Sequence, residues 1–148
     1  MGYHASALIR FLIVAIALLL LVFVLHAFAL SGLGWMPDLE GLSRYGLGPV
    51  TDPPATLQLG GWMLEILALT ALFLLVQGRS GSWWLDGLAT GWIAWVFRGP
   101  VMVLAIERWS RLPRDPWWPL ALRWLVLYTV CGLLLALIAR RLRLGREV

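Results

Sequence analysis

The chain has 148 residues, of which 61% are hydrophobic and only 14% are charged. Soluble domains contain about 45–50% apolar and about 25% charged residues, so this composition excludes an ordinary soluble domain and indicates a surface that faces lipid. The net charge is +4, but the Arg residues that supply it lack the interleaved, solvent-facing pattern of a nucleic-acid groove, and we expect no nucleic-acid partner.

The first predicted element is a transmembrane helix at about residues 7–30. Its apolar run is close to the ~20 residues that cross a hydrocarbon layer of about 30 Å. A cleaved signal peptide is the other interpretation, because Arg10 precedes the run and Ala27-Phe28-Ala29 resembles a cleavage site. The run is longer than the core of about 7–15 residues in a usual signal peptide, which favours a retained helix.

A long segment rich in Gly and Pro follows, at about residues 31–58. Residues 37–45 could form a short interfacial helix that ends near Gly46. Long loops often bind a partner or carry function, and a plain surface connection is the alternative.

Three further apolar runs predict transmembrane helices at about residues 59–76, 84–106 and 117–139. Helices are expected because an open strand cannot satisfy its backbone hydrogen bonds in lipid. A short polar turn joins the first two of these helices into an antiparallel hairpin. The sequence therefore predicts an all-α fold, a bundle of four transmembrane helices that forms a single domain over residues 1–148.

The distribution of Arg residues predicts an orientation for this bundle. One end would carry six of them: Arg10, Arg79, Arg140, Arg141, Arg143 and Arg146. The other end would carry four: Arg44, Arg108, Arg111 and Arg114. Because basic residues favour the inside, we expect both termini in the cytoplasm and the protein in a bacterial inner membrane.

Tryptophan residues gather near the expected ends of the helices, as in the aromatic belts of membrane proteins. Trp92, Trp95 and Trp124 would lie deeper. They could face lipid or pack between helices, and the alternative is that they stack on a ring-shaped ligand.

Three charged residues, Glu65, Arg98 and Arg123, fall inside the predicted spans, where each costs roughly 2.5–3.5 kcal/mol. Counting about 1.5 Å per residue from the expected outer ends of the helices places these residues about 8–12 Å below the outer boundary. His26 would lie at the same level on the first helix. The sequence thus predicts one polar layer to which each helix contributes one side chain.

Two interpretations of this layer are open. The Arg side chains could extend to the outer boundary while Glu65 pairs with one of them to hold the bundle together. Alternatively, Arg98 and Arg123 with Glu65 leave one positive charge in excess, which suits a phosphate or carboxylate from an anionic lipid headgroup. His26 would then titrate or form a hydrogen bond within that site.

One face of the third helix carries Gly87, Gly91, Ala94 and Arg98, at intervals of four, three and four residues. Small residues let a neighbouring helix approach closely, so this face is expected to pack inward and to bring Arg98 to the interior. Pro100 removes a backbone donor and predicts a kink just before it.

Asp86 is expected to lie in the first turn of the third helix, where a carboxylate is stabilised by the helix dipole. A proton relay from Asp86 to Glu65 would need more polar groups than Thr70, Thr90 and Tyr128 supply. We therefore expect a structural role for Asp86.

Cysteine and histidine are too few for redox or metal chemistry within the chain. Cys131 is the only cysteine, which excludes an intrachain disulfide. His4 and His26 do not combine with Cys131 or with carboxylates at a metal-ligand spacing. We expect no metal and no other cofactor.

Three classes of function are compatible with such a bundle. The first is a non-catalytic accessory or assembly subunit of a larger membrane complex, which could also bind an anionic lipid headgroup near the outer face. The second is a small transporter or channel that works as an oligomer, and the third is an intramembrane enzyme acting on a lipid-linked phosphate. We favour the first, with partner subunits or a second copy of the chain, because no nucleophile and base have a recognised catalytic spacing.

Overall fold

The computed structural model describes residues 2–32, 55–109 and 117–142. Within these ranges the fold is all-α, as predicted. Its helical elements are α1 (Gly2–Gly32), α3 (Ala55–Val76), α4 (Trp83–Val96), the π-helical turn η1 (Phe97–Val101), α5 (Met102–Trp109) and α6 (Trp117–Arg141). The interfacial helix expected at residues 37–45 lies outside the described residues.

Four helices are long and apolar enough to cross a membrane, which confirms the predicted class of fold. These spans are Ser6–Ala29, Thr56–Val76, Trp83–Ala105 and Trp117–Arg141. The third is continuous through α4, η1 and most of α5. Several helices extend beyond their apolar runs, because a helix continues wherever its backbone can form hydrogen bonds, whereas the runs mark only the part suited to lipid.

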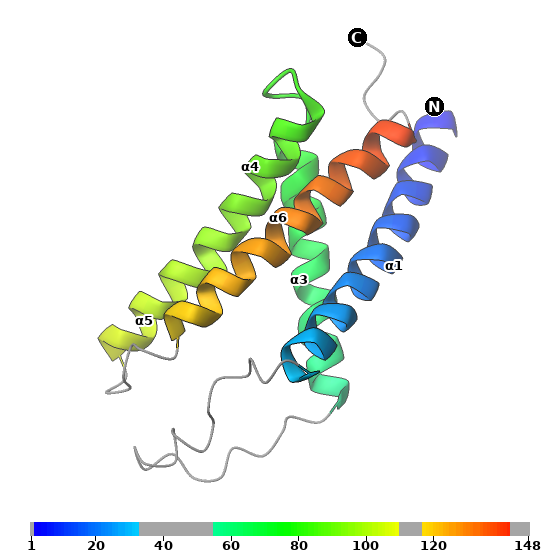
Figure 1. The fold of residues 1–148 in the computed structure, drawn as a ribbon. Coiled ribbons are helices and arrows are strands. Elements are labelled where there is room, and N and C mark those ends of the chain that lie inside the picture. The colour runs from blue at the N-terminus through cyan, green and yellow to red at the C-terminus, as the bar shows by residue number, and fades with distance from the viewer. Residues whose placement is uncertain (1, 33–54, 110–116, 143–148) are drawn as a thin grey trace.

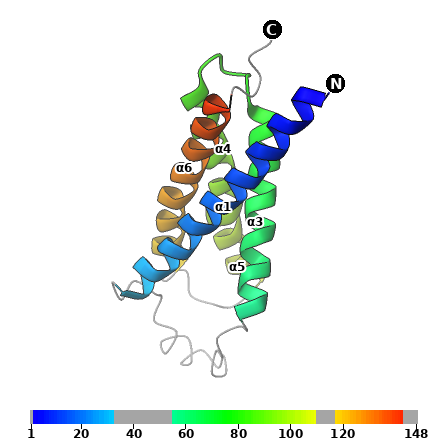
Figure 2. The same cartoon turned by 90° about the vertical axis from the view of Figure 1, so that its right-hand side faces the viewer.

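The start of α1 and the end of α6 lie at the same end of the bundle, together with the turn between α3 and α4 (Figure 1). α6 packs mainly along α4, and α1 lies across α3 and α6 (Figure 2). At the end with the termini, the Arg140 guanidinium lies 5.1 Å from the centre of the Trp83 ring and connects the end of α6 to the start of α4. Arg10, Arg79 and Arg141 also belong to this end.

The core of the bundle follows the helical period. On α1 every fourth residue is buried, at Phe11, Ala15, Leu19 and Phe23, which places all four on one face. The opposite face keeps large apolar side chains exposed, such as Ile13 at 63%. An apolar exterior around an apolar core is the arrangement expected where lipid replaces water.

α4 and α6 approach each other backbone to backbone. A Cβ atom added at Gly87 would lie 2.8 Å from the carbonyl oxygen of Gly132. A Cβ at Gly91 would collide with the carbonyl oxygen of Tyr128, and one at Gly132 would collide with that of Gly87. The structure thus places the small-residue face of the third span directly against α6, where only glycine fits.

The expected kink near Pro100 takes the form of a π-helical turn at Phe97–Val101. Proline has no N–H to donate and its ring crowds the preceding turn, and a wider turn accommodates both effects. Next to this turn the indole Nε1 of Trp95 donates a hydrogen bond to the carbonyl oxygen of Ala121 at 2.7 Å, which fastens the end of α4 to α6.

Asp86 organises the turn that precedes its helix. Its carboxylate is 4% exposed and accepts hydrogen bonds from the backbone N–H of Gly78 at 2.7 Å and of Ser80 at 3.1 Å. The Ser80 hydroxyl donates a further bond at 2.7 Å. Gly78 and Gly81 have a positive φ, and this left-handed backbone conformation folds the turn back over the carboxylate. The expected interaction of Asp86 with the helix dipole was therefore only part of its role.

We expect Gly91→Ala to destabilise the protein by about 1–3 kcal/mol, because the added methyl group forces α4 away from the Tyr128 carbonyl. The measurement is thermal unfolding of the purified protein in detergent. Gly60→Ala is the matched control, since an added Cβ there has no neighbour within 4 Å and alanine favours a helix. Equal unfolding temperatures for the two variants would contradict the close contact.

Candidate functional site

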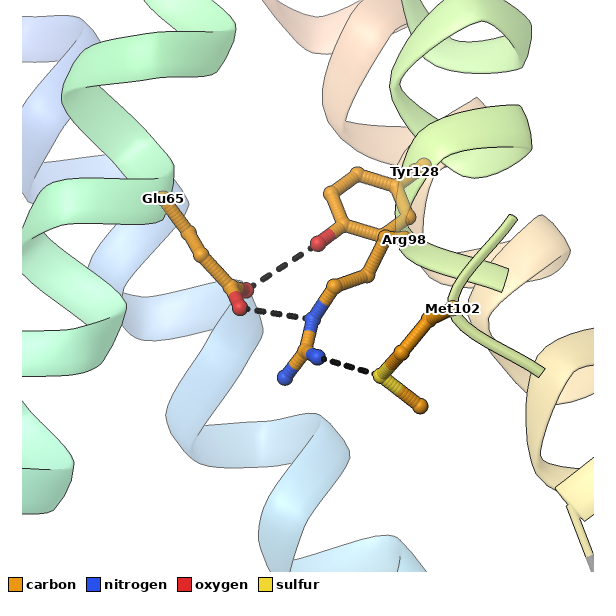
Figure 3. A network of polar contacts seen from close by, with 4 residues as sticks. All are labelled: Glu65, Arg98, Met102 and Tyr128. Carbon is orange, nitrogen blue, oxygen red and sulfur yellow. Dashed lines mark hydrogen bonds and ion pairs between the residues drawn. The ribbon is translucent and has the colours of Figure 1, made fainter. Parts of the chain in front are cut away.

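An ion pair joins α3 to η1 (Figure 3). The Nε atom of Arg98 lies 2.8 Å from Oε1 of Glu65. The hydroxyl of Tyr128, on α6, donates a hydrogen bond to Oε2 of Glu65 at 3.0 Å. Each carboxylate oxygen thus contacts a different element of the fold, and the Glu65 side chain is fixed by both.

The Arg98 guanidinium has two additional supports. Its central carbon lies 4.4 Å from the centre of the Trp124 ring, within the range of a cation–π interaction. Its Nη1 atom donates to the sulfur of Met102 at 3.1 Å, one helical turn further along. α5, α6 and α3 together hold the guanidinium, so the pair has a defined position in the bundle.

Tyr128 is positioned by packing as well as by its hydroxyl. Phe23 of α1 packs edge-on against the Tyr128 ring, with centroids 6.5 Å apart. Phe23 also meets Trp62 of α3 edge-on at 6.3 Å. The contact of Gly91 with the Tyr128 backbone fixes the same residue from the side of α4.

The place of the polar network along its helices follows from the helix bounds. α3 begins at Ala55, so Glu65 is ten residues, or about 15 Å, from the outer end of its helix. Tyr128 is eleven residues, or about 16 Å, from the start of α6 at the same end of the bundle. These distances are counted from the helix ends and not from a membrane boundary, so the depth of about 8–12 Å stays a prediction. The network lies about halfway along these helices.

His26 on α1 and Arg123 on α6 form a second group of polar side chains. The two side chains are close enough to interact electrostatically. The Nε2 atom of His26 is buried and has no hydrogen-bond partner within the described ranges. Of the four residues predicted as one layer, the structure brings Glu65 and Arg98 into direct contact and places His26 next to Arg123.

A pocket of about 330 Å³ opens between α3 and α4 beside the ion pair. Its lining consists of Glu65, Ala68, Leu69, Leu72, Ala94, Phe97, Arg98 and Tyr128. The side chains of Glu65 and Arg98 are 28% and 41% exposed. The pocket therefore combines an apolar groove with a charged pair that remains accessible from the outer surface of the bundle.

The sequence analysis did not place Tyr128 in the site. It considered Tyr128 only as part of a proton relay from Asp86 to Glu65, for which the polar groups are too few. A signal was present, since Trp124 and Tyr128 are four residues apart on one face of a helix. Trp124 stacks on the guanidinium and Trp95 fastens α4 to α6, whereas Trp92 is 56% exposed. These positions support the packing and lipid-facing interpretations of the deep tryptophans.

The contacts of the pair suit a binding site. Arg98 and Tyr128 each contact one oxygen of Glu65 and hold the carboxylate in place. Among the described residues, no group of three or more His, Cys, Asp or Glu side chains could hold a metal ion. The exposed side of the pair can accept or donate further hydrogen bonds to a molecule in the groove.

The pair should show strong coupling in a double-mutant cycle of Glu65→Gln and Arg98→Gln. Each single variant leaves one charge without its partner in apolar surroundings, and the double variant removes both charges. We expect the double variant to be destabilised less than the sum of the single variants, by about 0.5–3 kcal/mol. Thermal unfolding in detergent measures this difference, and strictly additive effects would show that the two charges act independently.

The interpretation of this site depends on the chain's own residues. Comparison of the chain with models of protein families, with curated proteins and with solved structures finds no match.

Proposed function

We propose that the protein is a non-catalytic accessory or assembly subunit of a larger complex in a bacterial inner membrane, with both termini in the cytoplasm. The observation that carries this proposal is the partly exposed Glu65–Arg98 pair beside an open groove on the outer surface of the bundle. Four apolar spans and the Arg residues at the end with the termini support the location and the orientation.

The exposed part of the ion pair needs polar partners. Lipid chains offer no hydrogen-bond partners, and charged groups exposed to hydrocarbon are costly. With 28% and 41% of their side chains exposed, Glu65 and Arg98 would be stabilised by polar groups of a protein seated on the groove. Polar residues that pair across helices are a common means of association in membranes.

Two observations favour a binding role over catalysis. Tyr128 and Arg98 each contact one oxygen of Glu65, which makes this carboxylate part of the connection between α3, η1 and α6. The glycine contacts between α4 and α6 hold the surrounding helices at close range, which suits a rigid scaffold better than a moving active site.

An anionic lipid headgroup near the outer face is a second part of the proposal. Arg123 lies six residues, or about 9 Å, inside the start of α6. An Arg side chain at this depth can extend to the headgroup region. His26, within electrostatic range of Arg123, would contribute to the same contact.

Native mass spectrometry of protein extracted gently from its own membrane tests the subunit role. We expect a second protein at fixed stoichiometry, and we expect this protein to be lost in the Arg98→Ala, Arg123→Ala double variant. Arg79→Ala combined with Arg140→Ala is the control, because it removes the same charge at the opposite end of the bundle. Wild-type protein that carries no partner protein would contradict the proposal.

A small transporter or channel is the second candidate, and the depth of the polar network favours it. Transporters commonly bind their substrates near the middle of the bilayer. Glu65 and Tyr128 lie about halfway along α3 and α6. Four helices enclose only a narrow space, so transport would require an oligomer.

Flux measurements in liposomes separate the two functions. For an accessory subunit we expect ion and solute flux equal to that of empty liposomes, both for the wild type and for Glu65→Gln. A wild-type flux that Glu65→Gln abolishes would instead establish transport through the polar network.

A further inference from the structure

We propose that a second copy of this chain docks on the groove between α3 and α4, so that the Glu65–Arg98 pairs of the two copies meet across a two-fold axis normal to the membrane. The inference rests on the proposed function in one respect, which is that the exposed pair marks an association surface. It adds the identity of the occupant and the residues that the occupant supplies.

Depth is the first argument for a protein occupant. Glu65 lies nine residues, or about 13 Å, inside the apolar span Thr56–Val76, and Arg98 lies seven residues, or about 10 Å, inside Trp83–Ala105. At these positions acyl chains surround the helices. A protein seated on the groove can offer polar groups to the pair, whereas an acyl chain cannot.

Symmetry is the second argument. A second copy inserted in the same orientation presents the same residues at the same depth, so a two-fold axis brings carboxylate and guanidinium groups into register. Each copy contributes one positive and one negative charge, and Glu65 of one copy can face the guanidinium of the other. The joined network has no net charge, so no uncompensated charge is buried.

Unused bonding capacity is the third argument. The Arg98 guanidinium carries five N–H donors, and its Nε and Nη1 atoms contact Glu65 and Met102 (Figure 3). Each oxygen of the Glu65 carboxylate has one contact among the described residues and can accept a second bond. Both members of the pair can thus bond within one chain and between chains at once.

The shape of the surface fits a helix–helix contact. Ala68 and Ala94 line the groove and allow another helix to approach closely. Phe97 at the groove is 68% exposed, and Leu64, one turn before Ala68 on α3, is 70% exposed. These bulky side chains next to small ones can interlock with their copies across the axis. The exposed apolar faces around Ile13 on α1 and Val126 on α6 suit lipid chains.

Crosslinking in native membranes tests the interface. In a Cys131→Ala background, Ala68→Cys and Val130→Cys each introduce one cysteine thirteen residues from the outer end of its helix. Ala68 lines the groove, whereas Val130 is 42% exposed on α6. With a short bismaleimide we expect several-fold more covalent dimer from Ala68→Cys than from Val130→Cys. Equal or smaller yields from Ala68→Cys would overturn the proposal.

A second measurement keeps the ion pair intact. Ala68→Trp fills the groove, and Val130→Trp adds the same bulk on α6. Both variants should keep the fold of the single copy, because both sites lie on its exterior. Native mass spectrometry from nanodiscs should show dimers for the wild type and for Val130→Trp, and monomers for Ala68→Trp. A dimeric Ala68→Trp variant, or a wild-type monomer that carries a lipid, would overturn the inference.

The outcomes also distinguish this inference from the proposed function. A dimer with no other protein attached supports the two-fold interface and contradicts the subunit role. A single copy bound to a different protein supports the subunit role and overturns the two-fold interface.

Discussion

The backbones of α4 and α6 touch at Gly87, Gly91 and Gly132, and the rest of the bundle depends on this contact. In a membrane, lipid chains solvate apolar side chains as well as a neighbouring helix does, so helices associate mainly through close van der Waals packing. Glycine provides that packing because it brings two backbones together without intervening side chains. The contact also fixes Tyr128, whose carbonyl oxygen lies against Gly91.

The polar network lies next to this contact between α4 and α6. Tyr128 extends from α6 to Glu65 on α3, and Trp124, one turn earlier, lies under the Arg98 guanidinium. The π-helical turn that accommodates Pro100 carries Arg98 itself. An irregular turn and a charged pair at the same place are both costly in lipid, and such features concentrate at functional sites. These features support the proposal that the groove beside the pair is an association surface.

Parts of the site could be predicted from the sequence. Charged residues inside apolar runs are rare enough to stand out, which singled out Glu65, Arg98 and Arg123. The spacing of Gly87 and Gly91 indicated the packed face of the third span. Tyr128 could not be recognised in the same way, because a tyrosine in a membrane helix is ordinary unless its hydroxyl has a partner. The role of Asp86 in the preceding turn was likewise hidden, since it depends on how that turn folds back.

The sequence by itself determined the class of fold, because unpaired backbone groups are too costly in lipid for apolar runs of this length to be anything but helices. It also identified the charged groups of the site, because charged residues are costly and therefore rare inside membrane spans. Only the tertiary structure decided which charges meet. Glu65 lies against Arg98 and Tyr128, whereas His26 lies near Arg123, and these pairings follow from how far each helix is rotated and where it begins. A shift of two or three residues along a helix turns a side chain to another face, and the hydrophobic period of lipid-exposed helices is too weak to fix that rotation.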